Sequence, residues 1–133
     1  MRVLETAIYA VNLAETAAFY ATVLGLERIV TVPDRHVFFQ MDDGVLLVFN
    51  PQTTVMPPGD ARLPVPPHGA VGPGHVCFAA TAEEIDYWLH RLVEANVDIE
   101  ADFTWPNGGR SIYFRDPAGN SVEFAEPRIW GLS

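Results

Sequence analysis

The chain has 133 residues, of which 49% are hydrophobic and 19% charged, a composition that suits one globular domain. Its net charge is −9 and its few basic residues form no cluster, so a nucleic acid is not expected as a partner. No apolar stretch could span a membrane, the N-terminus lacks the layout of a secretion signal, and one cysteine excludes an internal disulfide, so we expect a cytoplasmic protein without a membrane partner.

The first half of the chain predicts four strands and one helix. Alternating apolar residues predict a strand over residues 2–11. Asn12 as N-cap and Glu15 three residues later predict the start of a helix, and Gly25 predicts its end. Three short apolar runs follow, with "PD" and "DDG" as turn signals between them: "ERIVTV", "HVFFQM" and "VLLVFN".

The second half repeats this order from His75. "HVCFAA" predicts a strand, and a helix follows with Thr81 and Glu84 as a capping box and Asn96 at its end. Three further strands are predicted in "DIEADFTW", "RSIYFR" and "SVEFAE". The same order of elements in both halves predicts two similar modules.

The two halves are separated by a linker with seven prolines and four glycines. A loop of this length is a plain linker, a lid or a binding loop, and its composition does not choose among them. We expect one domain over residues 1–133, with module one at about 2–50, the linker at 51–74, module two at about 75–127 and a tail at 128–133. The apolar tail residues are expected to dock on the same chain or across a dimer: Ile129, Trp130 and Leu132.

Three segments carry a resemblance to a known family: "FYATVLGL", "GHVCFAATAEEID" and "GGRSIYFRDPAGNSVEFAEP". They resemble the vicinal oxygen chelate superfamily, which includes glyoxalase I, extradiol dioxygenases and bleomycin-resistance proteins. The resemblance extends over about residues 3–127. It implies an α+β fold in which two βαβββ modules form a cup-shaped, mostly antiparallel mixed sheet with helices on the outer side. It also implies a small-molecule substrate and a homodimer.

The resemblance further implies metal ligands on the first and last strands of each module, where this chain has Glu5, Leu47, His75 and Glu123. Leucine cannot coordinate a metal, so the expected ligands are Glu5, His75 and Glu123. Two carboxylates and one imidazole suit a divalent metal such as Zn, Ni, Mn, Fe or Co. Strand alternation agrees, because each candidate shares its face mostly with small residues while bulky apolar residues lie on the other face.

Each of these residues also has a simpler explanation. Glu5 alone is typical of a solvated acid at a sheet edge, and His75 alone is typical of a half-buried, hydrogen-bonded histidine. Glu123 alone could form an ion pair with Arg110 or Arg128. Their occurrence together at repeat-equivalent positions favours the metal site.

Further residues are candidates for catalysis or substrate contact. Glu5 and Glu123 could transfer a proton, and Tyr113 could donate one or stabilise an oxyanion. The candidates for substrate contact are Tyr9, Phe39, Phe49, His68, Trp105, Arg110 and Ser111. Core packing is the alternative for the aromatic residues, solvent exposure for His68, and an ion pair with Asp102 or Glu123 for Arg110. Cys77 is expected to be a small core residue.

The expected function is that of a glyoxalase-like, divalent-metal-dependent enzyme acting on a small oxygen-chelating substrate by lyase, isomerase or thiol-transferase chemistry. The alternative is a metal-free small-molecule or antibiotic-binding protein of the bleomycin-resistance type. An extradiol dioxygenase fits less well, because it needs two histidines and one carboxylate and only one histidine stands at a ligand position.

Overall fold

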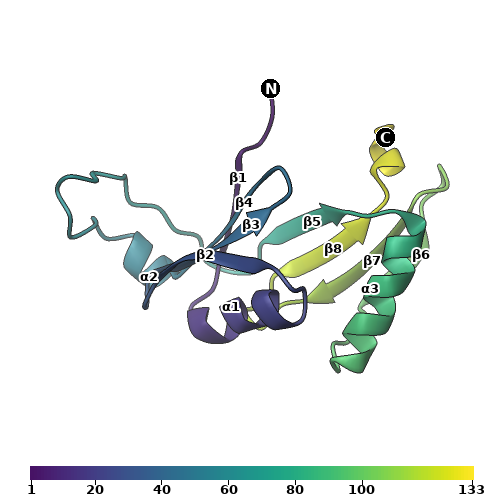
Figure 1. Cartoon of the computed structure of the whole chain (residues 1–133), viewed down its shortest axis with the longest axis horizontal. Helices are drawn as coiled ribbons and strands as arrows, with labels where there is room; N and C mark the ends of the chain where they lie inside the picture. The colour runs from purple at the N-terminus through teal and green to yellow at the C-terminus, as the bar shows by residue number, and fades with distance from the viewer.

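The computed structural model describes residues 1–133 and contains two four-stranded sheets (Figure 1). The first sheet has the order β1-β4-β3-β2 and the second the order β5-β8-β7-β6. Strand β1 runs parallel to β4 and β5 runs parallel to β8, and all other neighbouring strands are antiparallel.

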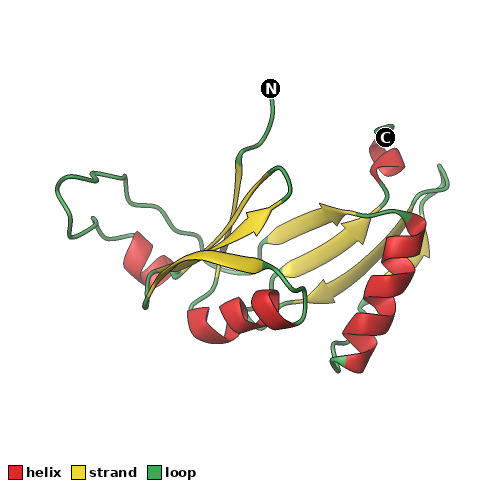
Figure 2. Cartoon of the chain, in the orientation of Figure 1, coloured by secondary structure: helices red, strands yellow, loops and turns green.

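The elements of module one are β1 (Glu5–Tyr9), α1 (Leu13–Thr22), β2 (Glu27–Val32), β3 (His36–Met41) and β4 (Gly44–Phe49). Those of module two are β5 (His75–Ala79), α3 (Ala82–Glu94), β6 (Ala101–Thr104), β7 (Arg110–Arg115) and β8 (Ser121–Ala125). The expected α+β class and the two βαβββ modules are therefore confirmed (Figure 2).

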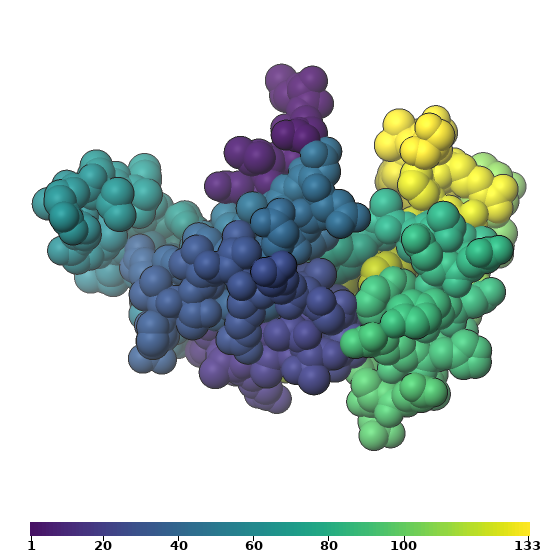
Figure 3. Space-filling model, viewed as in Figure 1, coloured from purple at the N-terminus to yellow at the C-terminus, as the bar shows by residue number.

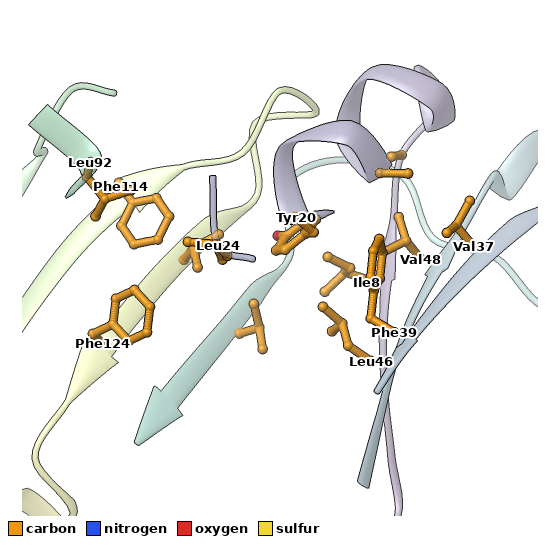
Figure 4. Close-up of a cluster of buried hydrophobic side chains, with 14 of the residues drawn as sticks. Ile8, Tyr20, Leu24, Val37, Phe39, Leu46, Val48, Leu92, Phe114 and Phe124 are labelled. Carbon is orange, nitrogen blue, oxygen red and sulfur yellow. The ribbon is translucent and has the colours of Figure 1, made fainter. Parts of the chain in front are cut away.

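Both modules contribute to one hydrophobic core of 18 buried residues. Figure 4 shows Tyr20 and Leu24 between Phe114 and Phe124 of the second sheet and the aliphatic residues of the first. Helix α1 therefore packs on both sheets, and the helix-facing sides of the two sheets face one shared core. Burial of large apolar side chains stabilises this arrangement, at roughly 1.5–3 kcal/mol each.

A buried polar network also joins the modules. The Tyr20 hydroxyl of α1 donates to Asp116 Oδ2 in the β7–β8 turn over 2.8 Å. Asn120 Nδ2 donates to the same Asp116 oxygen and to the Tyr9 backbone oxygen at the end of β1. Burial and, second, the charge of Asp116 raise the pKa of Tyr20 far above its usual value. The tyrosine is therefore a permanent donor between the two modules.

The two long helices begin and end where their capping signals predict. In α3 the Thr81 side chain accepts from the Glu84 backbone N–H, and the Glu84 carboxylate accepts from the Thr81 backbone N–H. Asn96 has a φ of 59° and Gly25 a φ of 70°, which is the left-handed conformation that ends a helix. Asn12 precedes α1 but its side chain bonds Glu15 and the Pro117 carbonyl instead of the helix backbone.

The linker contains a short helix that the sequence did not predict, α2 (Pro51–Thr54). The Asn50 side chain accepts from the Gln52 N–H, and Pro51 occupies the first turn, where its missing N–H costs nothing. Residues 56–67, which we call the arm, then extend away from the body and return (Figures 1 and 3). The His68 N–H donates to the Thr54 carbonyl over 2.9 Å and closes the arm at its base.

The tail forms a single 3₁₀ turn, η1 (Pro127–Trp130). Ile129 lies against Gly109, whose Cβ position it fills. Trp130 and Leu132 remain 80% and 65% exposed, so the expected docking on the same chain holds for Ile129 alone. No helix in the structure is long and apolar enough to cross a membrane.

Candidate functional site

Each sheet has a helix-facing side in the core and an opposite side without a helix. We call this helix-free side the outer face of the sheet, and it is the side that would line the expected cup. Side chains alternate along a strand, and residues paired across strands share a face. The outer face of the second sheet therefore carries His75, Cys77 and Ala79 from β5, Ser121, Glu123 and Ala125 from β8, and Ser111, Tyr113 and Arg115 from β7, with Arg115 ion-paired to Glu100. This register brings His75, Glu123 and Tyr113 together on one face, as the sequence predicted.

Glu123 and His75 form the centre of this face. His75 Nε2 lies 3.3 Å from Glu123 Oε2, and the Glu123 side chain is only 6% exposed. His75 Nδ1 lies 3.0 Å from the Ser121 carbonyl oxygen, which can only accept, so Nδ1 carries a proton. In the neutral ring, Nε2 then directs a lone pair at a carboxylate. Two acceptors facing one another favour a cation between them.

The second oxygen of Glu123 supports the same conclusion. Glu123 Oε1 is buried and has no hydrogen-bond partner. A buried carboxylate oxygen without a donor costs free energy unless a cation or a proton neutralises it. An imidazole nitrogen and a carboxylate also form a common donor pair for divalent metals. The residues present therefore fit the metal that the resemblance implies.

Two protonated side chains flank Glu123 on the neighbouring strands. Cys77 is paired with it on β5 and Tyr113 on β7. Burial and, second, the charge of Glu123 raise the pKa of the Cys77 thiol to about 12, while burial and, second, hydrogen bonding to Glu123 raise the pKa of the Tyr113 hydroxyl to about 12. Cys77 is thus a thiol at neutral pH, not a nucleophilic thiolate, and Tyr113 is a proton donor. Cys77 lies on the outer face beside Glu123, so its expected place in the core is wrong.

Ser111 and Trp105 lie together at one end of this face. The Trp105 indole N–H donates to Ser111 Oγ over 2.8 Å, and Ser111 is fully buried. The Trp105 ring lies 4.9 Å from Phe103, which in turn stacks on Tyr113 at 5.9 Å. These rings form a wall beside Tyr113, so Trp105 is near the site while Ser111 is covered.

Arg110 lies on the opposite, helix-facing side. Its guanidinium binds Asp102 of β6 at 2.9 Å and Asp86 of α3 at 2.6 Å. Both carboxylates raise its pKa, and it points away from Glu123. The prediction that Arg110 contacts substrate does not agree with this placement, because the alternation of side chains along β7 puts Arg110 on the helix-facing side together with Ile112. Arg128 bonds Glu126, so neither arginine neutralises Glu123.

The outer face of the first sheet is mostly apolar and aromatic. It carries Glu5, Ala7 and Tyr9 from β1, Val45, Leu47 and Phe49 from β4, and His36, Phe38 and Gln40 from β3. The linker adds His68, whose Nδ1 lies 2.7 Å from the Tyr9 hydroxyl and whose ring lies 4.5 Å from Phe49. Phe39 is fully buried on the other face against Tyr20, so the prediction that it lines the site is wrong.

Strand pairing also places Leu47 at the equivalent of Glu123. Leu47 lies between Ala7 and Phe38, as Glu123 lies between Cys77 and Tyr113. It is 7% exposed and packs as an apolar residue. The fourth ligand position is therefore occupied by a side chain that cannot coordinate.

Within one chain, Glu5 does not join His75 and Glu123. The helix-facing sides of the two sheets share one core, so their outer faces point away from it in different directions. No group of three His, Cys, Asp or Glu side chains in the single chain has the spacing to hold a metal ion. Glu5 is exposed and its side chain has no ion-pair partner, so its carboxylate can reach a ligand outside its own chain.

A groove of about 680 Å³ also opens between the two sheets. It is lined mainly by helix-facing residues such as Leu24, Phe78 and Trp88, and it contains neither His75 nor Glu123. Its apolar walls belong to the space between the modules. Cys77, which is paired with Glu123, also lines the groove, so the groove reaches the edge of the polar constellation of the second sheet.

Known proteins are similar to this chain in both sequence and structure. A family model described as the Glyoxalase/Bleomycin resistance protein/Dioxygenase superfamily matches residues 2–124. A crystal structure of lactoylglutathione lyase from Agrobacterium tumefaciens is 45% identical, with a TM-score of 0.92, over 98% of this chain and 97% of that one. A comparison with curated proteins gave no match.

More distant structures show the fold. A glyoxalase/bleomycin resistance protein/dioxygenase from Nocardioides is 21% identical, with a TM-score of 0.72, over 95% of this chain and 83% of that one. A virulence protein from Salmonella typhimurium is 24% identical, with a TM-score of 0.68, over 95% and 96% of the two chains. With two βαβββ modules and a family match over nearly its whole length, the chain belongs to the Glyoxalase/Bleomycin resistance protein/Dioxygenase superfamily.

Proposed function

We propose that the protein is a glyoxalase-like, divalent-metal-dependent enzyme that acts on a small substrate through adjacent oxygens. The observation that carries this proposal is the buried, unpartnered Glu123 Oε1 next to His75, whose Nε2 faces the same carboxylate. Such a pair is costly by itself and favourable around a cation. The 45% identity to a structure named lactoylglutathione lyase supports lyase chemistry.

The third ligand in this proposal is Glu5 of a second copy of the chain. The outer face of the first sheet carries Glu5 and that of the second carries His75 and Glu123, and both faces lack a helix. A two-fold dimer can place the first module of one copy against the second module of the other, which forms two equal cups. Three protein ligands would leave open positions for substrate or water.

The side chains around the site have distinct tasks in this proposal. A divalent metal held by these residues would polarise a substrate carbonyl and stabilise the negative charge that develops on its oxygen. Tyr113 holds its proton at neutral pH and can donate a hydrogen bond to that oxygen. The exposed Glu5 carboxylate can accept a proton from the substrate carbon adjacent to this carbonyl group.

Metal content tests the proposal directly. The wild type and a His90→Ala variant are expected to bind one divalent metal per chain, since His90 is an exposed residue of α3. A His75→Ala variant is expected to lose the metal and the rise in melting temperature that the metal produces. Unchanged metal affinity in His75→Ala, measured by elemental analysis and thermal melts, would rule out this site.

A second candidate is a metal-free small-molecule-binding protein. It is favoured by Leu47 at the fourth ligand position and by the aromatic outer face of the first sheet. Wild-type protein purified without chelators would then contain no stoichiometric metal, and added metals would not raise its melting temperature. It would still bind a small organic ligand.

A further inference from the structure

The outer face of the first sheet carries a group of rings, which we call the aromatic surface: Tyr9, His36, Phe38, Phe49 and His68. We propose that this surface binds the planar or apolar body of an uncharged substrate, and that the substrate is not an anionic glutathione adduct. This inference rests on the proposed function and names its substrate class.

The rings form a continuous contact chain. His36 stacks on Phe38 at 4.2 Å, Phe38 meets Phe49 edge to face at 5.4 Å, and Phe49 meets His68 edge to face at 4.5 Å. These are the distances and angles at which aromatic pairs attract one another. A planar ligand ring can pack against these side chains with the same stacked or edge-to-face geometry.

The aromatic surface is separate from the hydrophobic core. None of its members belongs to the 18-residue core, because they alternate along their strands with core residues such as Val37 and Val48. His68 is exposed, and Tyr9, His36 and Phe38 are half-buried. The surface also shares its face with Glu5, the proposed third ligand. A cup closed by a second copy would therefore place these rings beside the metal.

The linker holds His68 in a defined place on this surface. Its backbone N–H donates to the Thr54 carbonyl, and its Nδ1 lies 2.7 Å from the Tyr9 hydroxyl. The next residue, Gly69, packs so closely that a Cβ would lie 2.6 Å from Val55 Cγ1 and 3.3 Å from the Pro51 carbonyl oxygen. A residue held by its backbone, its side chain and its neighbour in this way loses little entropy when a ligand binds.

His36 contributes a neutral polar atom to the surface. His36 Nδ1 is buried without a hydrogen-bond partner, and burial followed by nearby Arg35 lowers the pKa of this imidazole. His36 is therefore uncharged at neutral pH. An unpartnered ring nitrogen favours a ligand that brings a hydroxyl or an amide donor.

The chain has few cations to offer an anionic substrate. It contains no lysine, and five of its eight arginines bind carboxylates: Arg2, Arg62, Arg110, Arg115 and Arg128. Arg91 donates to carbonyls at the end of α1, and Arg28 is paired with Phe39 on the helix-facing side. Arg35 alone lies near the aromatic surface, where it donates to the Thr53 carbonyl.

This distribution disfavours a glutathione adduct. Such an adduct brings two carboxylates, which bind best to paired arginines or lysines. The proposed cup contains Glu5 and Glu123 and has only Arg35 near its aromatic side. A second copy of the chain adds the same arginines with the same carboxylate partners. An uncharged ligand avoids the resulting repulsion.

Matched ligand pairs test the inference on the full-length protein. We would measure binding of 2-hydroxyacetophenone, hydroxyacetone and S-lactoylglutathione by calorimetry, with the metal and without it. The ring ligand is expected to bind about tenfold more tightly than hydroxyacetone, consistent with one aromatic contact plus ring burial. S-lactoylglutathione is expected to bind more weakly than the ring ligand at low salt.

Variants assign the preference to the surface. Phe38→Leu keeps an apolar side chain and removes a ring, and it is expected to lower the affinity for 2-hydroxyacetophenone far more than that for hydroxyacetone, so that most of the ring preference is lost. Trp130→Ala, which removes an exposed ring from the tail, should leave the affinities for both hydroxyketones unchanged. Equal affinity for the two hydroxyketones, tighter binding of S-lactoylglutathione, or no effect of Phe38→Leu would overturn the inference. A ring preference in protein that binds no metal would support the aromatic surface while rejecting the metal-dependent function.

Discussion

At the scale of single residues, Tyr20 connects the two modules. Its hydroxyl donates to buried Asp116, which also accepts from the Ala118 and Asn120 backbone N–H groups. Tyr20→Phe removes one of these donors and leaves a partly unsatisfied carboxylate. We expect the free energy of unfolding at pH 7 to fall by about 1–2 kcal/mol, as measured by urea denaturation.

The pH dependence of this loss has a definite sign. The pKa of Tyr20 is raised in the folded chain, so its contribution is complete below the ordinary tyrosine value of about 10. Above that pH the unfolded chain releases the proton first, and unfolding becomes easier. The stability difference between the wild type and Tyr20→Phe should therefore shrink above pH ~10. A difference that grows there, or an equal effect of the exposed control Tyr87→Phe, would contradict this role.

At the scale of elements, the arm is a self-closed loop. Its ends meet where His68 bonds Thr54, and its tip is held by an Asp60–Arg62 ion pair of its own. Replacing residues 57–66 by a short Gly-Ser link should change the free energy of unfolding by less than about 1 kcal/mol, because loop length affects closure entropy only weakly. A large loss in thermal melts would show that the arm packs on a second copy. The matched control is Gly69→Val, which keeps the arm but displaces its base and should destabilise the protein.

Local signals predicted most of the elements. The capping box placed the start of α3, Gly25 and Asn96 marked the ends of both long helices, and turn residues separated the strands, since these effects depend on neighbours in the chain. The short helix α2 was missed because four residues carry no periodicity, although Asn50 and Pro51 together are a typical helix start.

At the scale of the whole molecule, the proposed dimer divides each cup between two copies. A Glu5→Gln variant and a His75→Ala variant should each be inactive by themselves. When they are mixed and allowed to exchange, one of the two cups in each heterodimer contains the native residues of both copies. Statistical exchange should therefore restore about one quarter of the wild-type activity.

The same mixture distinguishes the alternative arrangement. If one chain formed the whole cup, no combination of the two variants would contain a native site, and activity would not return. Sedimentation of the mixture serves as the control that dimers form. Activity restored without dimers would also reject the shared cup.

The sequence by itself determined the repeat and the alternation of faces, because these follow from strand periodicity and from the order of elements, whereas the grouping of His75, Glu123 and Tyr113 was implied by the family resemblance and agreed with that alternation. The same alternation along β3 is compatible with Phe39 in the core, and the neighbouring Phe38 was not predicted from the sequence as a substrate-contact residue. The tertiary structure decided which side of each sheet faces the shared core, since α1 packs on both sheets at once. That packing separates Glu5 from His75 within one chain, turns Arg110 toward α3 and brings His68 onto the first sheet. Contacts between segments far apart in the chain depend on the packing of whole elements, which local patterns do not encode.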